Sequence, residues 1–124
     1  MKLRFLGKDS TPTNSPTLYA TDTDSYVIQG WIVTDAAILE RLTVPNDQTV
    51  VEVPPGLLDY LALDGLATER RNHVAPIVYV TDKGNYIIQG KRVTDSQTLG
   101  QMNIPDYEIG IQVSKSSVAL LVGG

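Results

Sequence analysis

Short runs of β-branched and aromatic residues, separated by turn residues, recur along this 124-residue chain. Residues 17–21 and 77–81 form such runs, and each is followed by four residues that include an aspartate. Apolar runs bounded by turn residues are typical of β-strands, and Gly84 supplies the positive φ that a tight hairpin turn often needs. Further runs at residues 26–33 and 86–93 predict the second strand of a β-hairpin in each half.

Each hairpin leads into a predicted short helix and a third strand. Asp35 and Asp95 follow a threonine and suit the N-cap position, where a side-chain oxygen accepts a backbone N–H. Pro45 and Pro105 then end the helices, because proline lacks the N–H that a helix interior requires. The expected helices cover residues 36–42 and 96–102, and the expected third strands cover residues 49–53 and 109–113. Each half is therefore predicted to be a ββαβ unit.

The second strand of each predicted hairpin contains a Gln-Gly pair. Gly30 and Gly90 occupy equivalent places, and because glycine weakens a strand interior, its recurrence indicates a bulge or a close backbone approach. Gln29 and Gln89 precede them, and a buried glutamine must satisfy its amide with hydrogen bonds. We interpret the glutamines as making cross-strand or backbone hydrogen bonds at the centre of the molecule. The alternative is a paired ligand-binding position.

The two halves are copies of one unit. Pairing each residue with the one 60 positions later gives 14 identities over the 38 pairs from Pro16 and Pro76 to Val53 and Val113, without a gap. Such an internal repeat predicts that each half covers the apolar face of the other. The predicted fold class is a single β-rich α+β domain, in which the tandem ββαβ units form a pseudo-twofold barrel or a pair of packed sheets.

The predicted organisation leaves three segments outside the repeats. They are an N-terminal segment (residues 1–15), a helix at 57–63 with a connection (residues 54–75), and a C-terminal segment (residues 114–124) that contains a turn and a final strand at 118–122.

Residues 16–22 (PTLYATD), 26–31 (YVIQGW) and 33–35 (VTD) resemble a family of short uncharacterised actinobacterial proteins. This resemblance implies a bacterial, cytoplasmic protein and brings no catalytic residues with it. Residues 39–44, the Asn-Asp pair at 46–47 and the strand at 49–53 are similar, more distantly, to the swapped-hairpin barrels of AbrB-type regulators. That likeness implies a barrel topology, and AbrB-type proteins bind DNA through arginine-bearing loops.

Composition and charge narrow the classes of function. A hydrophobic share of 42% with 19% charged residues is typical of a folded globular protein. The formal net charge of −4 argues against broad electrostatic attraction to nucleic acid or to an anionic membrane. The absence of cysteine excludes disulfides, thiolate metal sites and a cysteine nucleophile. No apolar run has the length of a secretory signal or of a membrane-spanning helix, so we expect a cytoplasmic protein.

Sequence motifs for catalysis or metal binding are weak. His73, the only histidine, has no adjacent pattern of serine, threonine or carboxylate that would make it a catalytic base. Asp22 and Asp24 lack the ligand spacing of a cation site and fit a turn. No glycine-rich phosphate loop or nucleophile elbow is present. We expect no catalytic residue, metal or cofactor, although an enzyme with a site between the repeats is a third alternative for the function.

Trp31 is the clearest difference between the copies, because Lys91 occupies the equivalent position. An exposed tryptophan is a common anchor of protein interfaces, and specialised function in a duplicated framework is expected where the copies differ. The other interpretation is that Trp31 packs under the helix at residues 57–63. We predict a non-catalytic interaction module, a regulatory or accessory protein that binds another protein through Trp31 and Gln29. The expected assembly is a monomer with a pseudo-dimeric core or a homodimer.

The alternative function is that of an AbrB-like DNA-binding regulator. It requires four basic residues to converge on one face, and it requires binding to weaken steeply with salt. These residues are Arg70, Arg71, Lys91 and Arg92.

Overall fold

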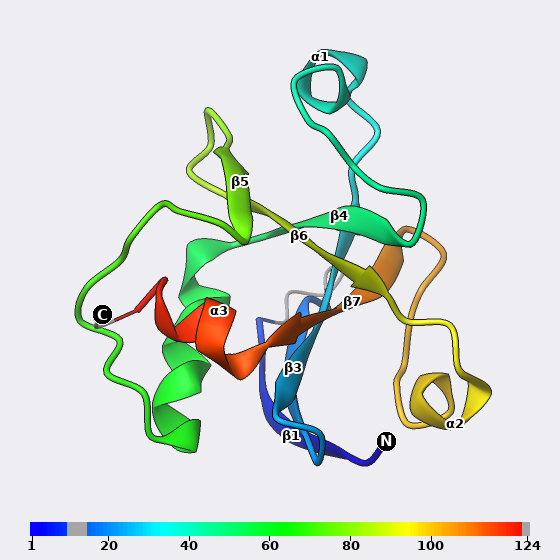
Figure 1. Ribbon diagram of the computed structural model, residues 1–124, viewed down its shortest axis with the longest axis vertical. Helices are drawn as coiled ribbons and strands as arrows, with labels where there is room; N and C mark the ends of the chain where they lie inside the picture. Colours follow the sequence, from blue (N-terminus) through cyan, green and yellow to red (C-terminus); the bar gives the residue numbers. More distant parts are fainter. Residues whose placement is uncertain (10–14, 123–124) are drawn as a thin grey trace.

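One antiparallel sheet dominates a β-rich α+β single domain, of which the computed structural model describes residues 1–9 and 15–122 (Figure 1). Its strands within that part are β1 (Leu3–Lys8), β2 (Thr17–Thr21), β3 (Ser25–Ile32), β4 (Gln48–Val53), β5 (Ile77–Val80), β6 (Tyr86–Arg92) and β7 (Glu108–Ser114). The helical elements are α1 (Ala36–Leu39), the 3-10 helix η1 (Pro55–Asp64), α2 (Ser96–Leu99) and α3 (Lys115–Ala119). Residues 10–14 of the expected N-terminal segment and residues 123–124 lie outside the described part.

Strands β3, β4, β6 and β7 close a ring in which the two halves interleave (Figure 1). β3 pairs with β7 along its length and with β4 at its end, where Trp31 lies opposite Glu52. β6 pairs in the same way with β4 along its length and with β7 at its end, where Lys91 lies opposite Gln112. Each pairing thus recurs 60 residues later with the halves exchanged. The long pairings therefore join one half to the other.

The outer strands of the sheet differ between the halves. β2 pairs with β3, and β5 pairs with β6, as the predicted hairpins require. β1 adds one more strand to the outer edge of β2, whereas β5 ends the sheet on the other side. β5 shifts register between Ile77 and Tyr79 and pairs regularly from Tyr79 onward.

Apolar side chains from both halves fill the centre of the molecule. Equivalent pairs meet there, namely Tyr26 with Tyr86, Ile28 with Ile88, Val51 with Ile111 and Val53 with Val113. Leu57, Leu58 and Leu61 of η1 are fully buried and complete this core together with Val118 of α3. Each fully buried aliphatic side chain contributes about 1.5–3 kcal/mol relative to an exposed one, so the shared core is the main source of stability.

Gly30 and Gly90 mark the places where one strand crosses another at short distance. A Cβ atom on Gly30 would lie 2.7 Å from the carbonyl oxygen of Glu52, and one on Gly90 would lie 2.7 Å from that of Gln112. The close approach predicted from the repeated glycine is confirmed. Gly84 has the expected positive φ of 84° in the turn between β5 and β6.

The predicted N-caps are confirmed, and the helices that they begin are shorter than expected. The carboxylate of Asp35 accepts the N–H of Ala37, and that of Asp95 accepts the N–H of Thr98. Each of α1 and α2 spans only four residues, and residues 40–41 and 100–101 continue as turns. The helix predicted at 57–63 is present as η1, which ends at Gly65 in the left-handed conformation with φ 86°.

One prediction for the ends of the chain is wrong, and one strand was not predicted. In place of the predicted final strand at 118–122, α3 extends to Ala119, a turn follows, and Val122 forms a single β-bridge with Arg71. α3 begins because Ser114 Oγ accepts the N–H of Ser117. Val118, Leu121 and Val122 are buried, and their spacing of three and four residues fits one side of a helical turn. The N-terminal segment contains β1, which the sequence did not indicate as a strand because its apolar residues do not alternate cleanly.

Candidate functional site

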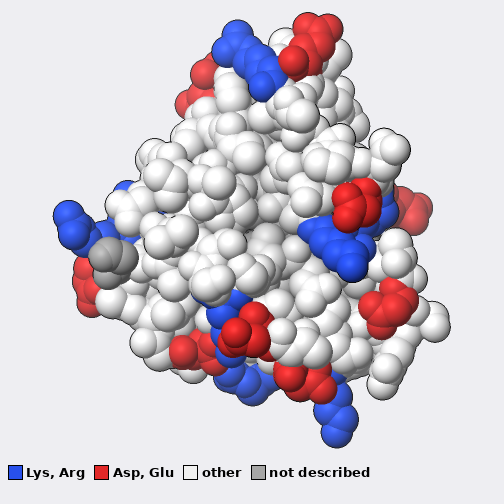
Figure 2. Space-filling view, in the orientation of Figure 1, with Lys and Arg blue, Asp and Glu red and all other residues white. Residues whose placement is uncertain are grey.

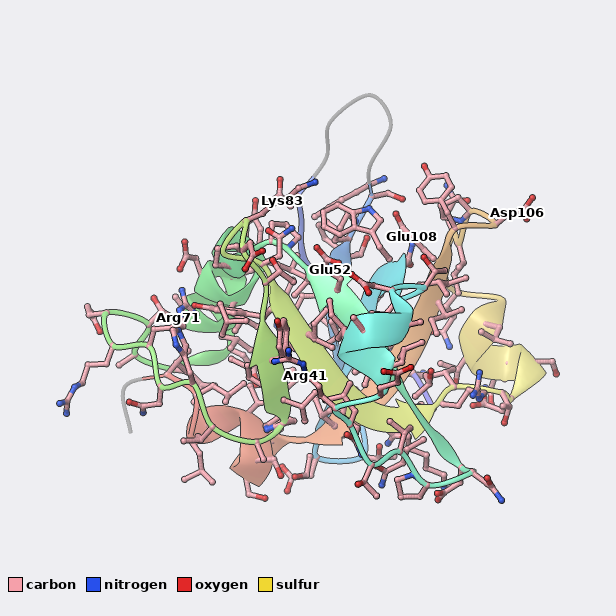
Figure 3. All side chains as sticks on the ribbon, turned by 90° about the horizontal axis from the view of Figure 1, so that it is seen from above. Arg41, Glu52, Arg71, Lys83, Asp106 and Glu108 are labelled. Atoms are coloured by element: carbon pink, nitrogen blue, oxygen red, sulfur yellow. The ribbon has the colours of Figure 1, made fainter. Side chains whose placement is uncertain are left out.

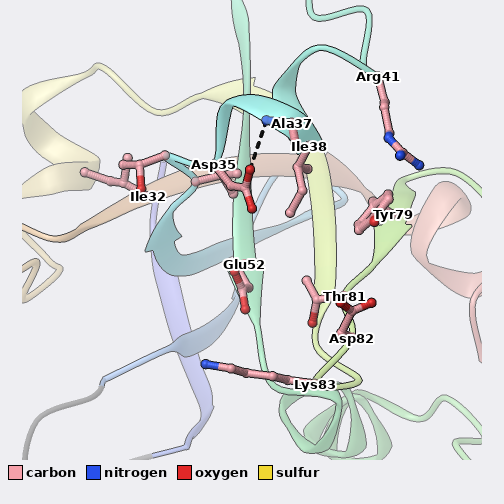
Figure 4. Close-up of a pocket in the computed structure, with 12 residues that line it drawn as sticks. Ile32, Asp35, Ala37, Ile38, Arg41, Glu52, Tyr79, Thr81, Asp82 and Lys83 are labelled. Atoms are coloured by element: carbon pink, nitrogen blue, oxygen red, sulfur yellow. Dashed lines mark hydrogen bonds between the residues drawn. The ribbon is translucent and has the colours of Figure 1, made fainter.

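A groove of about 450 Å³ opens between the segment that carries α1 and the turn between β5 and β6 (Figure 4). Ile32, Asp35 and Arg41 line it from the first half, while Tyr79 and Lys83 line it from the second. The two halves thus meet at this groove, because β4 passes beneath α1 and pairs with β6. The groove depends on the tertiary structure, since its two sides are some 40 residues apart in the chain.

Three charged side chains of the groove are exposed and make no hydrogen bond or ion pair within the described part of the chain. They are Arg41, Asp82 and Lys83. Figure 4 shows Arg41 and Lys83 on different sides of the groove. The other carboxylates are engaged, because Asp35 caps α1 and Glu52 Oε2 accepts the Asn85 amide at 2.8 Å. The groups available to a ligand are therefore two cations and one carboxylate.

Trp31 is half-buried and precedes the groove residue Ile32 in β3, but it does not itself line the groove. It is opposite Glu52 of β4 and Glu108 of β7, both labelled in Figure 3. Directly opposed residues of antiparallel strands project from the same face, so Trp31 shares a face with Glu52, a groove residue. η1 packs against β1 and β2, and Trp31 is outside the core cluster that η1 completes. These contacts place Trp31 nearer the groove surface than the helix.

Gln29 forms the hydrogen bonds predicted for it. Its Nε2 donates to the carbonyl oxygen of Asn103 at 2.8 Å and to Glu108 Oε1 at 2.7 Å. Ser15 donates its N–H and its hydroxyl to the same carboxyl group at 3.1 Å. Gln29 is fully buried, so its side chain does not lie on the surface where the hypothesis of a protein contact would require it. Its amide joins the two halves instead.

Gln89 makes the equivalent bonds from the second half to the first. Its Nε2 donates to the carbonyl oxygen of Thr43 at 3.3 Å and to Gln48 Oε1 at 2.7 Å. Thr43 and Gln48 precede the partners of Gln29 by 60 residues. The predicted cross-strand role of both glutamines is confirmed, because both amide nitrogens donate to the other half. The amide oxygen of Gln29 is buried and accepts no hydrogen bond from the described residues.

The four basic residues of the DNA-binding alternative do not gather on one face. Arg71 donates to Asp59 at 2.7 Å and lies over the ring of Tyr86, with 5.9 Å between the guanidinium carbon and the ring centroid. Tyr86 begins β6, whereas Lys91 and Arg92 end it, about 17–20 Å farther along at 3.3 Å per residue. Figure 3 shows Arg71 well away from the groove residue Glu52. Arg70 adjoins Arg71 in the chain.

Acidic and basic side chains are intermingled around the rim of the face in Figure 2, so this face carries no broad basic patch. His73 is exposed, and its ring lies edge-on to Tyr86 with 5.4 Å between centroids. Among residues 1–9 and 15–122, no three His, Cys, Asp or Glu side chains form a group that could hold a metal ion. No helix in the same ranges has the length and apolar character needed to cross a bilayer.

Sequence reasoning missed Arg41 and Lys83. The signal was present, because their counterparts are the neutral residues Gln101 and Thr23, and the same comparison of copies had singled out Trp31. Comparison of the chain with known families, with curated proteins and with solved structures finds no match. The groove is therefore the feature of the molecule from which a function can be inferred.

Proposed function

We propose that this protein is a non-catalytic interaction module, with a regulatory or accessory role, that binds another protein at the groove between the α1 segment and the β5–β6 turn. The observation that carries the proposal is the set of unpartnered side chains Arg41, Asp82 and Lys83 beside exposed Ile32. Ile32 is 39% exposed, and Tyr79 is half-buried in the groove. Apolar and aromatic groups flanked by free charges are typical of protein-binding surfaces.

Trp31 extends this surface. Its pairing with the groove residue Glu52 supports a place for the indole near the groove, and tryptophan is enriched among the residues that dominate binding energy. Lys91, at the equivalent position of the second half, provides no such anchor. The proposal thus retains Trp31 as a contact residue and moves the centre of the surface to the groove.

The duplication supports a rigid framework for such a surface. We interpret the four-stranded ring as a pseudo-twofold barrel built from two ββαβ units, in line with the likeness to AbrB-type barrels. The recurrence of every ring pairing 60 residues later supports this interpretation. A framework braced by both halves keeps the groove residues in place without help from a ligand, which lowers the entropic cost of binding.

Photo-crosslinking in cells that express the chain natively tests the proposal. Benzoylphenylalanine in place of Ile32 is expected to give a discrete adduct with one protein. The control carries it in place of Leu63 of η1, which is 66% exposed and lies outside the groove. We expect no such adduct from the control, and Trp31→Ala should lower the yield from position 32. Equal adducts from both positions, or none from either, would contradict a protein-binding groove.

A further inference from the structure

The two outer edges of the sheet are equivalent in the repeat, but only one of them is covered. β1 lies along the outer edge of β2, with Leu3 opposite Thr21 and Phe5 opposite Tyr19. The equivalent edge in the second half is formed by residues 79–81, which are the end of β5 and the residue after it. No strand of the described residues pairs with that edge. The molecule thus contains both an occupied and an empty version of the same strand site.

The start of β1 lies in the counterpart of the groove. Gln101 holds it with two hydrogen bonds, donating Nε2 to the carbonyl oxygen of Met1 at 2.8 Å and accepting the N–H of Leu3 at 2.9 Å. Asp22 Oδ1 accepts the N–H of Lys2 at 3.0 Å. In the occupied site, the side chains of Gln101 and Asp22 thus form hydrogen bonds with the backbone of residues 1–3.

Each of these contact residues has a counterpart in the groove. Asp22 corresponds to Asp82, which has no partner in the described chain and is available to accept a backbone N–H. Gln101 corresponds to Arg41. Thr23, whose hydroxyl contacts the sulfur of Met1 at 3.7 Å, corresponds to Lys83.

The edge of β5 presents its backbone groups in the direction that a further strand needs. The N–H of Thr81 points inward, since it donates to the carbonyl oxygen of Asn85 at 2.9 Å. In an antiparallel strand alternate residues point their N–H and C=O to opposite sides, so those of Val80 face outward. Ala20, the counterpart of Val80, lies opposite Arg4 of β1. The register shift before Tyr79 limits the free edge to a few residues.

We propose that the groove and the edge of β5 bind an extended peptide of the partner protein, added as a strand in the way that β1 is added to β2, and that this peptide carries, at the position of Met1, an acidic side chain facing the cations that line the groove. The inference rests on the proposed function and names its ligand. Strand addition to an exposed sheet edge is a common mode of peptide recognition, in which backbone bonds give affinity and side-chain pockets give specificity.

We infer an acidic side chain in the peptide because the charges of the occupied site and the groove differ. Neutral Gln101 and Thr23 contact a strand that begins with Met1, whereas the groove offers two cations, Arg41 and Lys83, in their places. Guanidinium and ammonium groups bind carboxylates by charge-assisted hydrogen bonds.

An aromatic residue is expected four positions after the acidic one. Phe5 meets Tyr19 edge-on, with 6.2 Å between ring centroids, at the fourth residue after Met1. Tyr79, the counterpart of Tyr19, lines the groove and is half-buried. An aromatic side chain of the peptide would cover Tyr79 as Phe5 covers Tyr19, because aromatic pairs favour edge-to-face contact.

Two synthetic peptides test the proposal with the full chain. Both are acetylated and labelled copies of residues 1–8, with either glutamate or glutamine in place of Met1. We expect the glutamate peptide to bind about fivefold more tightly, as one exposed ion pair allows, and to lose this preference in high salt. Amide NMR signals of Val80 and Asp82 should shift on binding. Shifts at Ala20 and Asp22 instead, equal affinity of the two peptides, or no saturable binding would overturn the proposal.

Matched variants separate the parts of the site. Arg41→Gln with Lys83→Thr converts the groove to the residues of the occupied site and should abolish the preference for glutamate. Lys91→Thr with Arg92→Gln removes the same charge elsewhere and should preserve it. Val80→Pro removes the outward N–H and should weaken both peptides about tenfold, whereas Val80→Thr, which keeps the N–H, should not. Thermal unfolding confirms that each variant is folded.

The same variants distinguish a failure of this inference from a failure of the proposed function. If the crosslink from position 32 persists at full yield in the Val80→Pro and Arg41→Gln/Lys83→Thr proteins, a partner binds the groove without adding an acidic strand, and this inference is wrong. If the peptides bind as expected but no crosslink forms in cells, the strand-binding site is supported and the proposed binding of a cellular protein is contradicted.

Discussion

Among single residues, Gln29 and Gln89 occupy equivalent positions but differ in burial. Gln29 and Gln89 make equivalent bonds, but Gln29 is fully buried and donates to the buried Glu108, whereas Gln89 is half-buried and donates to half-buried Gln48. A buried carboxyl group that loses a donor bears the full cost of desolvation, while a half-exposed amide takes a bond from water instead. The copies are therefore unequal in energy despite their equal geometry.

Replacing each glutamine by leucine is expected to expose this inequality. Gln29→Leu should lower the free energy of unfolding by about 2–3 kcal/mol, because Glu108 loses a buried donor, and Gln89→Leu should lower it by about 1 kcal/mol. Urea denaturation measures both values. Gln97→Leu, at an exposed position of α2, serves as the control and should change little. Equal losses for Gln29 and Gln89 would contradict the role assigned to burial.

Asp64 joins three elements through its carboxylate. It accepts the hydroxyl of Tyr26 at 2.6 Å and pairs with Lys115 at 3.1 Å and with Arg4. Burial by itself raises the pKa of Asp64, but the hydrogen bonds from Tyr26 and Lys115 outweigh it and hold the pKa below its ordinary value. Burial, and then the hydrogen bond to Asp64, raise the pKa of Tyr26. Both groups thus keep the charge states that their bond requires at neutral pH.

Asp64→Asn is expected to destabilise the protein in a pH-dependent way. Because the native-state pKa of Asp64 is lowered, its stabilising effect is complete above the unfolded-state pKa of about 4 and is lost as the pH falls through the lower native value. The difference in melting temperature between wild type and variant should be greatest near neutral pH and shrink below about pH 4. Asp59→Asn, which removes an exposed pair with Arg71, should show a much smaller difference. A gap that is constant with pH would refute this account.

At the scale of elements, the ends of the chain depend on tertiary context. Residues 118–122 are apolar and β-branched enough to resemble a strand, yet Ser114 caps a helix there. The helix is favoured because it turns Val118 and Leu121 onto the core, which a strand at that place would leave half-exposed. β1 is a strand although its apolar residue Phe5 is 59% exposed. It forms because the edge of β2 is available for pairing.

The capping bond of α3 gives a prediction at this scale. Ser114→Ala removes the acceptor of the Ser117 N–H and should lower the free energy of unfolding by about 1 kcal/mol. Ser114→Asn keeps a cap-competent oxygen and should restore most of the loss. The measurement is chemical denaturation followed by far-UV circular dichroism. Equal stability of the alanine variant and wild type would mean that packing of Val118 alone maintains α3.

At the scale of the whole molecule, the ring makes the halves interdependent. β3 depends on β7 for most of its hydrogen bonds, and β6 depends on β4, so neither half has a complete sheet of its own. The core likewise takes equivalent residues from both halves. The duplication therefore produced one cooperative unit rather than two domains.

Unfolding is expected to occur in a single transition. The fluorescence of Trp31, the only tryptophan, reports on the end of β3, and far-UV circular dichroism reports on the whole chain. The two denaturation curves should coincide, as they do for two-state domains. A fragment of residues 1–75 should remain unfolded alone, because β3 and β4 would lack β7 and β6. Separate transitions, or a folded fragment, would show that the halves are independent.

The duplication, the hairpins, the capping aspartates and the close approach at Gly30 follow from the order of residues alone. These features depend on local preference and on comparison of residues 60 positions apart, both of which can be read along the chain. The sequence also predicts that Gln29 makes cross-strand or backbone hydrogen bonds, because a glutamine within an apolar strand must satisfy its amide. The complete burial of Gln29 was not predicted, because burial depends on which strands surround it.

Which edge of the sheet is covered, and which residues line the groove, depend on long-range packing. β2 and β5 are equivalent strands, but β1 pairs with β2 alone, since its connection to β2 is short and β5 lies elsewhere in the sheet. Arg41 and Lys83 face one groove because β4 pairs with β6, a contact between distant parts of the chain. Long-range pairing is selected by the packing of the whole molecule, and local sequence preference does not record it.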